Sequence, residues 1–165
     1  MFRPTADAIA ASDLSVTLQN MLWVVPVSQS IHIACLSVLF ASAMMINLRL
    51  LGVGSKGRSV SSLVATLVPW MWGALLGCFL TGALQTLIEP VRQFVTPIFW
   101  GKMGLIILMA LLTAWLARTV RANSALWDGA HRPAAARVFA VVSSAAWITI
   151  ITFGRFIGYV WANYA

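Results

Sequence analysis

Four long apolar runs, separated by short polar connections, dominate the pattern of the chain. They cover about residues 24–48, 62–88, 97–118 and 138–163. Because a helix rises about 1.5 Å per residue, each run is long enough to cross a hydrocarbon layer roughly 30 Å thick. The pattern predicts an all-α fold, a four-helix transmembrane bundle that forms a single transmembrane domain over residues 1–165.

The segment before the first run has a different pattern. Apolar and polar positions alternate irregularly over about residues 5–20, which predicts an amphipathic helix lying on the membrane surface, its second half capped by Asp13. This segment lacks the apolar centre of a signal peptide, so we expect the first span to direct insertion.

Composition agrees with lipid as the main solvent. Hydrophobic residues make up 61% of the chain and charged residues only 9%, with a mean hydropathy of +0.89, whereas a soluble domain carries about 25% charged residues. The net charge of +7 would suit nucleic acid in a soluble protein. Here no basic stripe interleaved with aromatic residues lies outside the spans, so the expected partner is the bilayer and not nucleic acid.

The basic residues predict the orientation. Seven of them lie in the connections between the first and second spans and between the third and fourth, against two on the other side. Since basic loops stay in the cytoplasm, we expect a bacterial inner-membrane protein with both termini in the periplasm. The seven are Arg49, Lys56, Arg58, Arg118, Arg121, Arg132 and Arg137, and the two are Arg3 and Arg92.

Three ionisable side chains remain inside spans, namely His32, Lys102 and Arg155. Their positions place all three roughly 7 Å outward of the midplane, on three different helices. Charges at such depths are costly and usually face a polar cavity. A shared cavity would attract an anionic group: a haem propionate, a quinone headgroup, a lipid phosphate or an anionic solute.

Neutral polar residues lie near the same level. Gln29 is one turn from His32, and Thr81 and Gln85 on the second span could add polar contacts. Two alternatives stay open. Lys102 and Arg155 could instead extend to the outer headgroups, and His32 could make a hydrogen bond between helices.

A metal site is a further alternative, with His32 as a ligand. His32 and Cys35 share a helix face, and Met44 and Met45 lie further along it; such soft ligands suit copper(I). His131 lies across the membrane, so the chain does not offer two histidines to one haem.

Enzymatic motifs are missing from the sequence. It contains no paired-carboxylate site, no Ser-His-Asp set, no HExxH and no phosphate-binding glycine loop. We therefore expect a protein that is not an enzyme by itself, while membership of an oxidoreductase complex stays open.

Several short motifs resemble a group of small bacterial membrane proteins of unknown function. They are Ile31-His32, Asn47-Leu48-Arg49-Leu50-Leu51-Gly52, Phe99-Trp100-Gly101-Lys102 and Gly154-Arg155-Phe156-Ile157-Gly158-Tyr159. Asn47 stands where the pattern has Asp. A more distant similarity is to copper-resistance-D-type and cytochrome-b561-like bundles. The resemblance implies a four-helix fold and singles out His32, Lys102 and Arg155.

The candidate binding residues are His32, Lys102, Arg155, Gln29, Gln85 and Tyr159. They favour a non-catalytic membrane subunit or anchor that holds haem b or a quinone near the outer leaflet, for electron transfer with a periplasmic or membrane redox partner. One alternative is a small transporter for an anion or metal ion, forming a homo-oligomer through Gly73 and Gly77. The other is a purely structural subunit.

Overall fold

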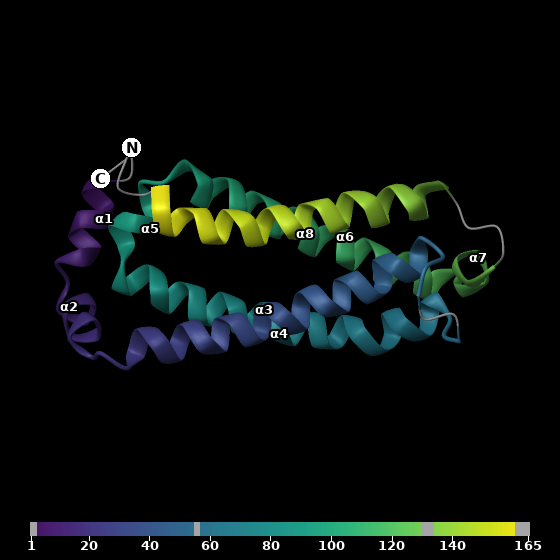
Figure 1. Cartoon of the computed structure of the whole chain (residues 1–165), viewed down its shortest axis with the longest axis horizontal. Helices are drawn as coiled ribbons and strands as arrows, with labels where there is room; N and C mark the ends of the chain where they lie inside the picture. The colour runs from purple at the N-terminus through teal and green to yellow at the C-terminus, as the bar shows by residue number, and fades with distance from the viewer. Residues whose placement is uncertain (1–2, 55–56, 130–133, 161–165) are drawn as a thin grey trace.

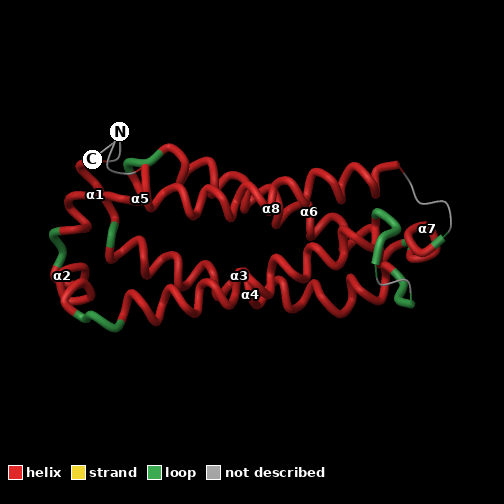
Figure 2. Tube along the Cα trace, viewed as in Figure 1, coloured by secondary structure: helices red, strands yellow, loops and turns green. Residues whose placement is uncertain are grey.

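The computed structural model describes residues 3–54, 57–129 and 134–160, and every regular element within them is an α-helix (Figure 2). Four of the helices are long and apolar enough to cross a membrane. The chain is therefore a multi-pass membrane protein, and the predicted all-α four-helix bundle is confirmed. These helices are α3 (Val24–Leu50), α4 (Val60–Ile88), α6 (Pro97–Ala122) and α8 (Ala134–Val160).

The four helices form two antiparallel hairpins, α3 with α4 and α6 with α8, which pack through α3 against α8 and α4 against α6 (Figure 1). The short helix α5 (Pro90–Phe94) joins the hairpins at one end of the bundle, and α7 (Ser124–Asp128) lies at the other. These ends are called the α5 end and the α7 end below.

The helix ends differ from the predicted spans by a few residues. The third span was predicted to end at Arg118, but α6 continues to Ala122. The apolar run marks only the membrane-embedded part of a helix, and the helix continues beyond it. The predicted end of the fourth span lies outside the described residues, as do Lys56, His131, Arg132, Trp161 and Tyr164.

The N-terminal segment forms two short helices instead of one, α1 (Arg3–Ala10) and α2 (Asp13–Asn20). The break falls at Ser12, whose hydroxyl accepts a hydrogen bond from the Ser15 N–H and caps α2. The prediction that Asp13 supplies this cap is wrong. The α2 helix is tied to the α5 end because Ser15 donates to the carbonyl of Leu87 at 2.8 Å.

The buried core occupies the α7 half and the centre of the bundle. Its members fall within residues 39–50 of α3, 60–74 of α4, 109–120 of α6 and 136–150 of α8, together with Trp127 of α7. The ribbons of the two hairpins lie further apart toward the α5 end (Figure 1). This apolar cluster therefore ends before the level of His32, Thr81 and Lys102.

Two contacts between helices fix the register of the bundle. Asn47, which is 1% exposed, donates from Nδ2 to the hydroxyls of Ser143 and Ser144, each at 3.1 Å. Gly77 lies against Cys35, where an added Cβ would meet the Cys35 Sγ at 2.6 Å, whereas Gly73 has nothing within 4 Å. Of the predicted small-residue pair, only Gly77 contacts a neighbouring helix within the chain.

Candidate functional site

His32 on α3 is joined to Thr81 on α4 by a 2.8 Å hydrogen bond at its Nδ1. The Thr81 hydroxyl also lies 2.7 Å from the carbonyl of Gly77, and the tautomer of His32 decides which atom of the His32–Thr81 pair donates. His32 thus makes the hydrogen bond between helices that was one of the alternatives, and its second ring nitrogen, Nε2, is not engaged in that bond.

Lys102 on α6 is partly buried and lies against α8. An added Cβ at Gly154 would lie 3.4 Å from the Lys102 Nζ, so this glycine makes room for the ammonium group. Lys102 and His32 both lie in the α5 half of the bundle, and no carboxylate among the described residues pairs with Lys102.

Arg155 and Tyr159 lie on a different face of α8. Both side chains are exposed, and the Arg155 guanidinium sits over the Tyr159 ring, 5.2 Å from its centroid. The structure therefore does not bring Arg155 to His32. Its exposed position suits a side chain that extends along the helix to the headgroups.

Gln29 and Gln85 line a cavity of about 50 Å³ at the α5 end. It lies one helical turn outward of the His32–Thr81 pair, since Gln29 precedes His32 by three positions and Gln85 follows Thr81 by four. We call it the α5-end pocket. Its lining residues are Val25, Gln29, Gln85, Ile88, Glu89, Arg92 and Gln93.

Arg92, which the sequence suggested was only a loop charge, is also a residue of this pocket. Its guanidinium pairs with Glu89 at 2.5 Å and packs against α8 at Gly158, where an added Cβ would lie 3.2 Å from one of its nitrogens. The signal in the sequence was the spacing of Gly154 and Gly158, one helical turn apart. These two glycines make room for the side chains of Lys102 and Arg92.

The pocket contains two buried donors that have no partner among the described residues, Gln85 Nε2 and Arg92 Nε. A buried donor without a partner costs about 1–3 kcal/mol. The α5 end therefore carries a polar region that its own side chains do not fully satisfy.

A metal site receives no support from the described part of the chain. No three His, Cys, Asp or Glu side chains there lie close enough together to hold an ion. Cys35 and Cys78 are free thiols, and the Cys78 Sγ lies 3.8 Å from the carbonyl oxygen of His32.

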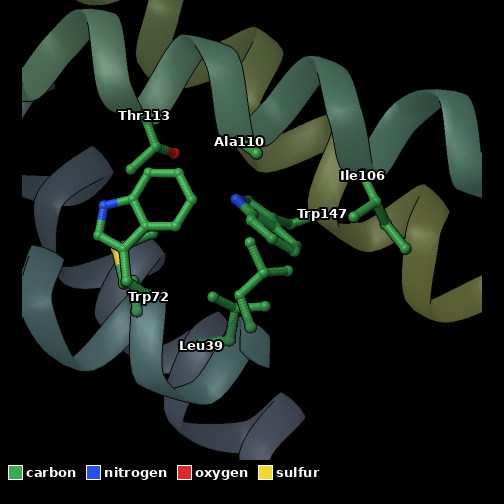
Figure 3. Close-up of a pocket in the computed structure, with 8 residues that line it drawn as sticks. Leu39, Trp72, Ile106, Ala110, Thr113 and Trp147 are labelled. Carbon is green, nitrogen blue, oxygen red and sulfur yellow. The ribbon is translucent and has the colours of Figure 1, made fainter. Parts of the chain in front are cut away.

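A second cavity, at the centre of the bundle, differs in character (Figure 3). It measures only about 10 Å³, is lined mainly by apolar side chains and lies between Trp72 and Trp147. Trp147 is 3% exposed, and its indole N–H is a buried donor without a partner in the described chain. A space of this size holds at most one water, so we assign no ligand to it.

Comparison with known proteins identifies the family. The model of a family of unknown function, DUF6644, matches residues 20–160, so the chain belongs to that family. No curated protein and no solved structure matches the chain. The family description assigns no activity, and the functional argument therefore rests on the site.

Proposed function

We propose that the protein is a non-catalytic membrane subunit that binds an anionic or oxygen-bearing membrane cofactor, haem b or a quinone, at the α5 end and serves electron transfer with a redox partner. The observation that carries the proposal is Lys102. It places a cation against Gly154, in the half of the bundle that also holds His32 and lies beyond the buried core, with no carboxylate partner among the described residues.

The energetics of a membrane charge support a ligand there. A lysine at the centre of a span costs roughly 2.5–3.5 kcal/mol on insertion scales, and one nearer the end, such as Lys102, costs less. Gly154 leaves space for the ammonium group, and an anionic or electron-rich oxygen atom would offset its cost. His32, in the same half of the bundle, adds a ring nitrogen, so the two residues offer hydrogen-bonding groups to a quinone oxygen.

Of the two cofactors, a quinone fits the described residues better. Haem iron held by His32 would need its second axial ligand from sulfur, from a partner protein or from solvent, because His32 is the one histidine in the described chain. A quinone needs only hydrogen-bonding groups, which His32, Lys102, Gln29 and Gln85 provide.

We also propose that the α7 end faces the cytoplasm of a bacterial inner membrane. Five described basic residues lie at or near that end, whereas Arg3 and Arg92 lie at the α5 end. This asymmetry follows the positive-inside rule, and the cofactor would then lie toward the periplasm. The five residues are Arg49, Arg58, Arg118, Arg121 and Arg137.

The test begins with the protein purified gently in detergent from cells that make both cofactors. Its absorption spectrum, oxidised and dithionite-reduced, detects haem, and solvent extraction followed by chromatography detects quinone. We expect quinone in the wild-type protein and less than a third of that amount in Lys102→Met and His32→Leu, because each removes a polar contact worth about 1 kcal/mol or more.

The matched control is Arg121→Leu, which removes a cation from the α7 end. It should retain the full amount of quinone. Unfolding temperatures measured on all variants separate loss of binding from loss of folding. Wild-type protein with neither haem bands nor quinone, and with an unfolding temperature unmoved by added decylubiquinone, would overturn the proposal.

A further inference from the structure

We infer that the α5-end pocket binds an uncharged carbonyl oxygen, that of a quinone headgroup, through the side chains of Gln85 and Arg92. The inference rests on the proposed function and names the group that the site receives. Sequence reasoning did not include Arg92, and its role follows from the geometry of the pocket.

The unpaired buried groups of the pocket are hydrogen-bond donors. Gln85 and Arg92 both line the cavity, and each has a buried N–H without a partner among the described residues. Because these two N–H groups have no hydrogen-bond partner among the described residues, they favour a ligand that accepts hydrogen bonds.

The charges that line the pocket favour an uncharged ligand. Arg92 already pairs with Glu89 at 2.5 Å, so the pocket has no net charge of its own. A phosphate or carboxylate ligand would meet the Glu89 carboxylate as well as the Arg92 guanidinium, and the repulsion would offset much of the attraction. An uncharged acceptor avoids this penalty, which favours a carbonyl over an anionic headgroup.

The volume of the pocket limits which part of a ligand can enter it. A cavity of about 50 Å³ exceeds the ~10–15 Å³ that a single water needs, and it is far below the ~300 Å³ at which pockets for whole drug-sized ligands begin. It has room for a carbonyl group, while the ring stays outside. Val25 and Ile88, the apolar lining residues, would then contact the ring edge.

The experiment titrates decylubiquinone into the full chain in detergent and measures the dissociation constant from quenching of tryptophan fluorescence. Two variants each remove one donor. Gln85→Leu deletes the amide, and Arg92→Lys deletes Nε while retaining a cation for Glu89. Each should weaken binding about 5- to 10-fold, the effect of one lost hydrogen bond.

The matched control is Gln93→Leu. Gln93 lines the same pocket, but its amide is not among the buried groups without a partner, so its loss should change the dissociation constant less than about twofold. Unfolding temperatures in the absence of ligand verify that the three variants fold. Equal effects at Gln85 and Gln93 would overturn the inference.

The remaining outcomes separate this inference from the proposed function. If Lys102→Met weakens decylubiquinone binding while Gln85→Leu and Arg92→Lys do not, the function stands and the pocket assignment fails. If the wild-type protein does not bind decylubiquinone, both fail. Displacement of decylubiquinone by short-chain phosphatidylglycerol at equal concentration would assign the pocket to a lipid headgroup and overturn the inference.

Discussion

At the scale of single residues, Lys102 and Arg155 lie at matching positions along their helices but have different neighbours. Lys102 and Arg155 each lie five residues from an α5-end helix terminus as described. The Lys102 ammonium group packs against Gly154, whereas the Arg155 guanidinium lies over the exposed Tyr159 ring. The facing of a side chain depends on which neighbour packs beside it, and hydropathy does not contain that information.

Asn47 provides a prediction at this scale. Asn47→Ala removes two hydrogen bonds between α3 and α8 and leaves a small void, so it should destabilise the bundle by about 1–2 kcal/mol. The measurement is unfolding in mixed micelles of increasing denaturing detergent. Asn20→Ala, at an exposed position at the end of α2, is the matched control and should change stability by less than about 0.5 kcal/mol. Equal effects of the two substitutions would contradict the structural role of Asn47.

At the scale of helices, the four long apolar runs predicted the spans, because a membrane leaves no alternative to a helix for satisfying the backbone. The short helices were missed. The α5 helix begins at Pro90, a favourable first position, and α7 is capped by Asn123, which accepts from the Leu126 N–H at 3.2 Å. Both carry local signals, but helices of five residues are too short to produce an apolar period.

The pairing of α3 with α4 yields the second prediction. Gly77→Ala would place a Cβ 2.6 Å from the Cys35 Sγ, so one of the two must shift, and we expect a destabilisation of about 1–3 kcal/mol. Gly73→Ala is the matched control on the same helix, since its Cβ would meet nothing within 4 Å. Thermal unfolding in detergent compares the two variants. A larger loss at Gly73 would indicate that this glycine packs against another copy of the chain, and would contradict the assignment of Gly77 as the contact residue.

At the scale of the whole molecule, the two halves of the bundle differ in what they bury. The α7 half holds the apolar core, together with two hydrogen bonds that the backbone N–H and the hydroxyl of Ser61 donate to the carboxylate of Asp128. The α5 half holds His32, Lys102 and the α5-end pocket, where polar groups remain unpaired. The apolar core in one half positions the helices, and the other half presents polar groups. A subunit that binds a ligand needs both features.

The orientation of the molecule gives the last prediction. The α7-end turn after α3, where Gly52 and Gly54 adopt positive φ angles of 83° and 72°, should lie in the cytoplasm, and the α5 end should lie in the periplasm. Alkaline phosphatase, which is active only where its disulfides form, should be active when fused after Val160 and inactive when fused after Val53. Green fluorescent protein fused at the same two positions should give the reverse pattern, which controls for expression.

Replacing Arg49, Arg58, Arg118 and Arg121 with Gln should weaken this orientation preference, because these residues supply most of the described charge near the α7 end. An active phosphatase after Val53 in the unaltered chain would place the polar half toward the cytoplasm, and the redox partner would then have to be sought there.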